Sequence, residues 1–100
     1  MPTPEKKVKE RLNKALKPFG EKLYRFMPVQ TGYGRKTLDY LLCVNGHFIA
    51  IETKAPGKKL TPLQEEIACQ IIDAGGTVFK VDGPAGIDRV VGHLISLTGE

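Results

Sequence analysis

The dipeptide Asn45-Gly46 lies between two runs of apolar residues, and it constrains the fold more than any other feature of the chain. Both central residues of a two-residue hairpin turn need a positive φ, which Asn and Gly adopt most readily. We therefore expect residues 38–44 and 47–54 to form an antiparallel hairpin. The turn fixes the register of this hairpin: Val44 faces His47, and five pairs further on Asp39 lies directly across from Glu52.

Periodic patterns predict helices and strands on both sides of the hairpin. Apolar residues at helical spacing indicate a helix over residues 4–17, which Pro18 and Gly20 end. A Thr-Pro start and the pair Gly75-Gly76 delimit a second helix from residue 61 to about residue 74. The other expected elements are strands at 22–28 and 77–82, a less regular helix at 87–97, and loops or turns at 31–36, 55–60 and 83–86.

This order, α-β-β-β-α-β-α, predicts an α/β fold with one central mixed sheet flanked by helices. The strands at 47–54 and 77–82 should be parallel and joined by a right-handed crossover through the second helix. A chain of 100 residues with 41% hydrophobic and 26% charged residues has the composition of one folded domain, residues 1–100.

Composition also excludes several classes of protein. No run of about 18 apolar residues is present, so no membrane-spanning helix is expected, and the charged start of the chain does not resemble a signal peptide. Cys43 and Cys69 lie inside apolar patterns, which predicts buried, reduced thiols in a cytoplasmic protein. A zinc site made from two Cys and two scattered His is not expected.

The charge is distributed unevenly along the chain. Residues 1–59 hold thirteen Lys or Arg and five Asp or Glu, a net charge of +8, whereas residues 60–100 carry −4. A basic half indicates a polyanionic partner, with nucleic acid ahead of an anionic membrane surface. The alternative is a solvated basic helix that contributes only solubility.

The hairpin register brings three ionisable side chains together. Asp39 lies across from Glu52, and Lys54 projects from the same face as Glu52 because it follows two residues later. Like charges on facing positions destabilise a sheet, and buried carboxylates need a partner. A divalent cation such as Mg²⁺ would remove the conflict, and Lys54 would then orient or deprotonate a water or offset phosphate charge. The alternative is a surface cluster in which Lys54 neutralises both acids.

The first helix contributes one more acid. Glu5 lies on the same helical face as the apolar positions that pack inward, whereas Glu10 points to solvent. Glu5 would therefore approach the cation. The alternative is an acidic residue in the first turn that interacts favourably with the helix dipole.

At this point the chain resembles a known family. Asp39 followed by Glu52-Thr53-Lys54 has the form of the PD-(D/E)xK nuclease signature, with Leu38 in place of the signature's proline. The surrounding sequence resembles more narrowly the VRR-NUC group, the virus-type replication-repair nucleases. From residue 4 to about residue 82, the matching features are Glu5 ahead of Gly20, Gly32 and Gly34 before Asp39, residues 48–57, Thr61 with Gln64, and Ala74-Gly75-Gly76 before residues 78–81.

The resemblance implies a restriction-endonuclease-like fold and Mg²⁺- or Mn²⁺-dependent cleavage of DNA. It implies that Asp39 and Glu52 are metal ligands, that the carbonyl of Thr53 is a further ligand, and that Lys54 is the catalytic lysine. Glu5 would be an auxiliary acid. Small stand-alone members of the group act as homodimers on branched DNA such as four-way junctions, which implies a role in phage-type replication, repair or recombination, in the cytoplasm of a bacterium or of a phage-infected host.

The remaining candidates have ordinary structural explanations as well. The resemblance places Gln64 beside the site, but a Gln three residues after Thr61 also caps a helix. Arg35 and Lys36 precede Asp39 and are expected to contact DNA, although the segment is also an ordinary connecting loop. Lys58 and Lys59 would meet phosphates or form a solvated turn. The alternative for the whole chain is a catalytically silent nuclease fold that binds DNA or a protein.

Overall fold

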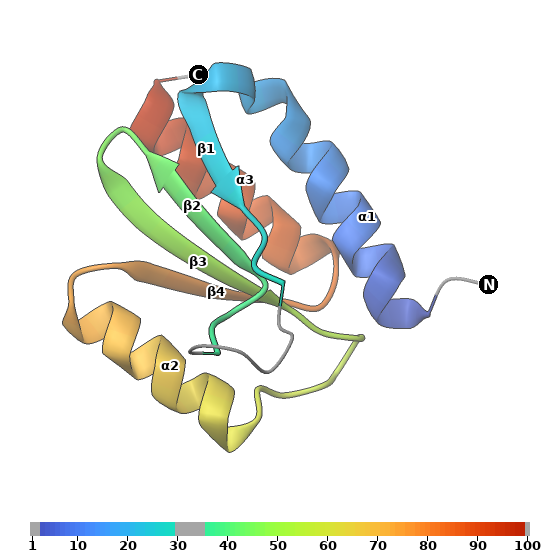
Figure 1. The fold of residues 1–100 in the computed structure, drawn as a ribbon. Helices are drawn as coiled ribbons and strands as arrows, with labels where there is room; N and C mark the ends of the chain where they lie inside the picture. The colour runs from blue at the N-terminus through green and yellow to red at the C-terminus, as the bar shows by residue number, and fades with distance from the viewer. Residues whose placement is uncertain (1–2, 30–35, 100) are drawn as a thin grey trace.

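A computed structural model describes residues 3–29 and 36–99 (Figure 1). The elements in chain order are α1 (Pro4–Leu16), a 3₁₀ helix η1 (Lys17–Lys22), β1 (Leu23–Phe26), β2 (Tyr40–Val44), β3 (His47–Thr53), α2 (Pro62–Asp73), β4 (Thr77–Val81) and α3 (Pro84–Thr98). The predicted α/β class, with helices packed on one mixed sheet, is confirmed. None of the helices in these two ranges is both long and apolar enough to cross a membrane.

The four-stranded sheet has the order β1-β2-β3-β4. The hairpin prediction is confirmed, since Asn45 and Gly46 have φ values of 49° and 80° and Val44 pairs with His47. Strand β1 adds to β2 in the antiparallel sense, and β4 adds to β3 in the parallel sense. The parallel pair β3 and β4 is joined through α2, as the sequence predicts.

Several predicted boundaries are wrong by a few residues. Strand β2 begins at Tyr40 rather than at residue 38, because the N–H of Asp39 donates to a side-chain oxygen of Glu52 instead of a strand carbonyl. Strand β1 is shorter than residues 22–28, and α1 gives way to η1 after Leu16. Helix α3 starts at Pro84, inside the predicted turn at 83–86, because a proline is readily accommodated in the first turn of a helix.

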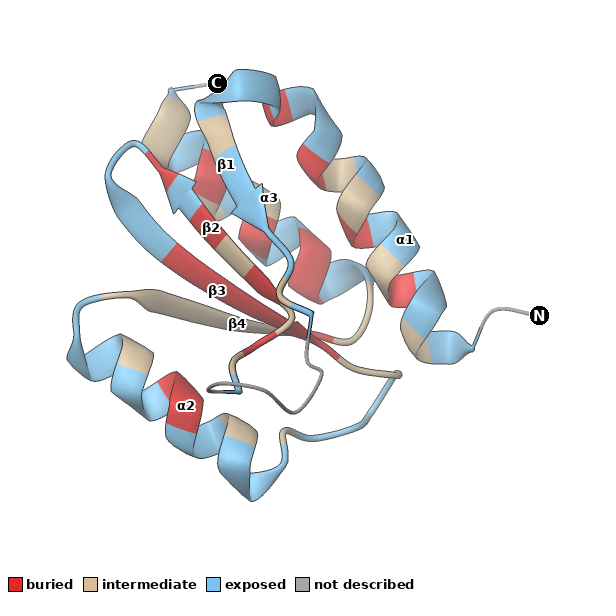
Figure 2. Ribbon diagram, viewed as in Figure 1, coloured by how far each residue is buried: buried red, intermediate tan, exposed pale blue. Residues whose placement is uncertain are grey.

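The two faces of the sheet carry separate hydrophobic clusters. Helices α1 and α3 cover one face, and the larger cluster lies beneath them; it includes Leu12, Leu42, Ile49, Ile51 and Leu94. Helix α2 covers the other face, where Leu38, Ala50 and Ile67 form the smaller cluster. Strand β3 lies between both clusters, and Figure 2 shows it buried over most of its length. Charged side chains at the carboxyl end of β3 are therefore expected to be partly or fully buried.

Helix α2 leaves part of its face of the sheet open. Tyr24, Cys43 and Phe48 occupy facing positions on β1, β2 and β3, and all three are exposed. The prediction that Cys43 and Cys69 are buried is wrong. Cys43 points to the uncovered part of this face, and Cys69 lies on the side of α2 that faces solvent.

Candidate active site

Asp39 and Glu52 are linked through each other's backbone. The Asp39 N–H donates to Glu52 Oε1 at 3.0 Å. In return, Asp39 Oδ2 accepts from the Thr53 N–H at 3.2 Å and from the Thr53 hydroxyl at 2.7 Å. These bonds continue the β2–β3 pairing one step beyond the last backbone pair, Tyr40 with Ile51. They also hold the two carboxylates side by side at the end of the hairpin.

Lys54 joins this pair, as the alternation along β3 predicts. Its Nζ lies 3.9 Å from Glu52 Oε2, and the side chains of Lys54 and Glu52 are only 13% and 6% exposed. The Lys54 N–H donates to the Val81 carbonyl at 2.9 Å, so the backbone stays paired with β4 one residue beyond the end of β3. The amine is thus held in a sheltered position next to Glu52.

Glu52 is in an environment that disfavours its charge. Its pKa is raised from the usual 4.5 to about 7, chiefly by burial and secondly by the negative charge of Asp39. The hydrogen bond from the Asp39 backbone and the charge of Lys54 both lower the pKa of Glu52, but they do not cancel the increase. A carboxyl group whose pKa is raised to this extent by burial and a neighbouring carboxylate is typical of a functional site.

Gln64 performs both of the roles that the sequence leaves open. Its backbone N–H and its side-chain Oε1 form a capping box with Thr61 at the start of α2. Its Nε2 donates to Glu52 Oε2 at 3.0 Å. The cap therefore fixes the side chain that in turn fixes the orientation of the Glu52 carboxylate.

Helix α1 brings Glu5 to the same region, together with a lysine that sequence reasoning missed. Lys9 Nζ lies 3.7 Å from Glu5 Oε2 and 3.7 Å from Asp39 Oδ2. Lys9 follows Glu5 by one helical turn, so its position on the inward face was a signal available in the sequence. Its contact with Asp39 depends on how α1 lies against the sheet.

Most of the predicted site residues line one cavity of about 420 Å³, which we call the active-site cavity. Its walls include Glu5, Lys36, Asp39, Glu52, Lys54 and Gln64. Thr53 is fully buried and does not line it. The convergence of Asp39, Glu52 and Lys54 that the hairpin register predicts is therefore present, and α1 and α2 each add one predicted residue.

The predicted DNA-contacting residues are divided between two places. Lys36 is exposed and lines the active-site cavity. Lys58 and Lys59 are exposed on the connection from β3 to α2 and do not line it, and the Lys58 carbonyl accepts from Lys80 Nζ at 3.2 Å. Arg35, Gly32 and Gly34 lie outside the described residues.

The acids offer the chemistry of a hard-cation site. Within residues 3–29 and 36–99, no three Asp, Glu, His or Cys side chains come close enough together to hold a metal ion. Asp39 and Glu52 nevertheless present two adjoining carboxylates, which is the number that Mg²⁺ commonly takes from a protein while it keeps several waters. Burial first, and the charge of Asp39 second, raise the pKa of Glu52, and a bound cation would favour the charged form of this carboxylate. The residues present therefore fit such an ion.

No protein-family model matches this chain, and a search of curated proteins also found no match.

Proposed function

We propose that this chain is a Mg²⁺- or Mn²⁺-dependent endodeoxyribonuclease with a restriction-endonuclease-like fold, of the VRR-NUC type. The observation that supports this most is the meeting of Asp39, Glu52 and Lys54 in one polar cavity at the end of a β-hairpin. Two acids and an amine in this arrangement are well suited to metal-assisted hydrolysis of a phosphodiester bond.

Each residue has a role that follows from its position. Asp39 and Glu52 would hold the ion. The Thr53 carbonyl and Glu5 are proposed as further ligands on the family resemblance alone, because Glu5 does not lie close enough to both other acids to share an ion with them in this structure. The bound ion would supply positive charge to the scissile phosphate and lower the pKa of its water. Lys54, sheltered beside Glu52, would orient the attacking water or stabilise the negative charge that develops on the phosphate.

Gln64 and the basic residues would act around this centre. The Gln64 amide keeps Glu52 Oε2 turned toward the cavity. Lys36 lies on the wall of the cavity, where it would contact a phosphate next to the scissile one, and Lys58 and Lys59 would contact DNA further away. Arg35, which is outside the described residues, is proposed as a further DNA contact. Binding should weaken steeply with salt, because neutralising phosphates releases counterions.

We also propose that the enzyme acts on branched DNA as a homodimer in the cytoplasm. One domain of this size presents one site, so symmetric cutting of a junction needs two sites related by a two-fold axis. Light scattering coupled to gel filtration tests the dimer. A protein that stays monomeric at high concentration would contradict it.

A cleavage assay tests the assignment. Linear, nicked, flapped and four-way DNA would each be incubated with Mg²⁺, Mn²⁺ or chelator. We expect metal-dependent cutting that Glu52→Gln and Lys54→Ala abolish. The matched controls Glu10→Gln and Lys7→Ala change the same residue types at exposed positions of α1, away from the cavity, and should cut normally. Unchanged cutting by both Glu52→Gln and Lys54→Ala would contradict the proposal.

One observation favours the alternative, a silent nuclease fold that binds DNA or a protein. The described acids are already partnered within the protein: Glu52 by the Asp39 N–H, Gln64 and Lys54, and Asp39 by Thr53. Such a cluster holds together without an ion. Calorimetric titration with Mn²⁺ separates the two functions, because only the nuclease predicts uptake that Glu52→Gln removes.

A further inference from the structure

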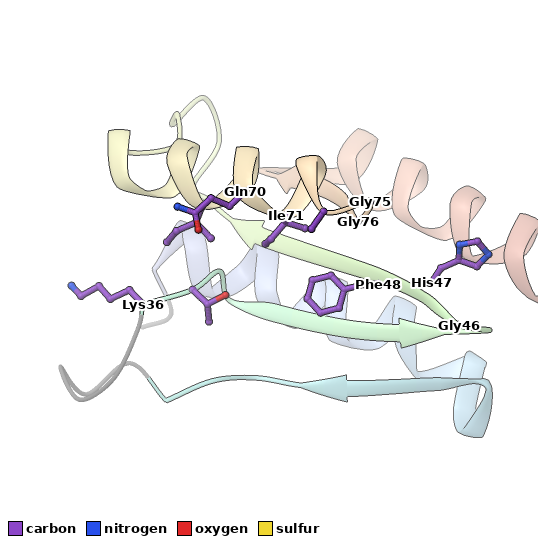
Figure 3. A pocket seen from close by; sticks show the side chains of 11 residues that line it. Lys36, Gly46, His47, Phe48, Gln70, Ile71, Gly75 and Gly76 are labelled. Carbon is purple, nitrogen blue, oxygen red and sulfur yellow. The ribbon is translucent and has the colours of Figure 1, made fainter.

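A second cavity adjoins the active-site cavity on the α2 side of the sheet. It has a volume of about 570 Å³ and lies between α2 and the turn end of the β2–β3 hairpin (Figure 3). Phe48, Ile71 and Gly76 form its apolar part, and we call it the Phe48 cavity. Lys36, Thr37 and Ile67 line both cavities, so the two are direct neighbours.

Phe48 is held in place and yet accessible. In Figure 3 its ring is seen over the strands of the hairpin, and Ile71 extends from α2 toward the sheet. A Cβ on Gly76 would lie 3.1 Å from Phe48 Cδ2 and 2.6 Å from Ile71 Cγ2, so the glycine is what allows the chain to pass this close. The ring nevertheless remains 44% exposed. A fixed and accessible aromatic ring is a surface on which a flat ligand stacks.

We propose that the Phe48 cavity binds an unpaired nucleobase of the DNA strand whose phosphate enters the active-site cavity. This inference rests on the proposed function, because it takes DNA as the ligand. A base offers a flat π-face for Phe48, and stacking on aromatic side chains is the usual way in which proteins hold unpaired bases. The volume lies within the range of about 300–1,000 Å³ that is usual for small-ligand sites.

A lysine on the shared wall and the nearness of the active-site cavity favour a nucleotide over an apolar partner. Lys36 lies on the wall shared by the two cavities, where it would meet the phosphate that connects the stacked base to the scissile phosphate. The first 59 residues, which supply Lys36 and Phe48, carry a net charge of +8. A base that is still paired in a duplex cannot enter, so the cavity would select DNA with an unpaired nucleotide near the cut.

The test measures binding without cleavage. Labelled flap DNA is prepared with an intact base, or with an abasic site, at each of the first few unpaired nucleotides beside the branch. Affinity is measured by fluorescence anisotropy with the full chain and a chelator. We expect one position at which loss of the base weakens binding about tenfold. Phe48→Leu should bind both DNAs equally weakly, whereas Phe48→Trp should keep the discrimination.

Phe26→Leu is the matched control, since Phe26 is 52% exposed on β1 and does not line the cavity. It should discriminate as the unchanged protein does. Equal affinity for intact and abasic DNA at every position would overturn the inference, and so would discrimination that survives in Phe48→Leu. A lowered mass of Phe48→Leu in light scattering, together with equal affinity of the unchanged protein for intact and abasic DNA, would show that the cavity is a contact between copies of the chain and would also overturn it.

Cleavage of the same flap DNA with Mg²⁺ keeps the two proposals distinguishable. Cutting without base discrimination removes the base site and leaves the nuclease. Discrimination without cutting removes the nuclease and leaves a base-binding module.

Discussion

Gln64 ties the start of α2 to the end of β3 through its contact with Glu52. One end of its amide accepts from the Thr61 N–H at 3.0 Å, and the other donates to Glu52 Oε2 at 3.0 Å. Because Gln64 caps a helix, its side chain is already fixed in the folded protein. The conformational entropy of that side chain is therefore lost when the protein folds and not when a ligand binds. The carboxylate is therefore oriented before any ligand arrives.

Two substitutions at this cap should separate its roles. Thr61→Ala removes a cap hydrogen bond and should lower the free energy of unfolding by about 1 kcal/mol, while DNA cleavage is largely kept. Gln64→Ala should cost a similar amount of stability and also reduce cleavage, because Glu52 loses its amide partner. Urea unfolding and cleavage rates measure the two effects. Equal cleavage by both variants would contradict a positioning role for Gln64.

The stability of the metal-free protein should depend on Glu52 through pH. Its pKa in the folded state is raised from 4.5 to about 7, so the folded protein binds this proton more tightly than the unfolded chain does. The contribution of this proton to the free energy of unfolding is fully present below pH 4.5 and is lost as the pH rises through about 7. The shift corresponds to about 3 kcal/mol at most.

Chemical denaturation in chelator, from acid to pH 8, measures this loss. Glu52→Gln has no proton to release at this position, so the difference in unfolding free energy between the two proteins should change in favour of the variant as the pH rises. A difference that stays constant across the range would contradict the assignment. Added Mg²⁺ should restore stability to the unchanged protein above pH 7, and not to Glu52→Gln.

Lys9 should compete with a cation for the acids of the site. Its amine lies within 3.7 Å of both Glu5 and Asp39, and its side chain is 32% exposed. Lys9→Met should tighten Mn²⁺ binding several-fold, because the acids lose a positive neighbour. Stability should change by less than about 1 kcal/mol, as is usual for exposed ion pairs.

Calorimetric titration measures the Mn²⁺ affinity. Lys7→Met is the matched control, since Lys7 is exposed and lies on the outer face of the same helix. If both variants bind Mn²⁺ as the unchanged protein does, Lys9 has no influence on the site.

Two glycines of α3 should respond in opposite ways to alanine. A Cβ on Gly86 would lie 3.2 Å from Val81 Cα, and backbone cannot move aside as a flexible side chain does. Gly86→Ala should therefore lower the free energy of unfolding by about 1–3 kcal/mol. Gly92 has nothing within 4 Å of such a Cβ, and Gly92→Ala should raise stability by about 0.5–1 kcal/mol. Thermal unfolding measures both, and a loss at Gly92 would contradict this account of α3.

Much of the site was accessible from local sequence because one turn fixes it. Asn45-Gly46 sets the hairpin register, and the two-residue alternation along β3 then places Lys54 beside Glu52. The Thr61–Gln64 cap is equally local. The sequence could not show that Gln64 also bonds to Glu52, because this contact requires the start of α2 to lie over the end of β3.

The predictions that were wrong also failed because they depend on contacts between elements that are distant in the sequence. Cys43 sits in a pattern that is typical of a buried strand, but α2 is positioned over β3 and β4 and leaves this part of the sheet open. Residue 39 fits a strand pattern, but its N–H donates to a side chain instead, so β2 starts at Tyr40 rather than at residue 38. Neither outcome is encoded in the residues next to these positions.

The sequence by itself determined the secondary structure near the hairpin, its register and the pairing of Asp39 with Glu52, because turns, caps and side-chain alternation act over a few neighbouring residues. Only the tertiary structure decided what α1 and α2 add: the contact of Lys9 with Asp39, the second bond of Gln64, and the cavity against Phe48. These depend on how separate elements pack, and packing is set by the summed burial of side chains that are distant in the chain.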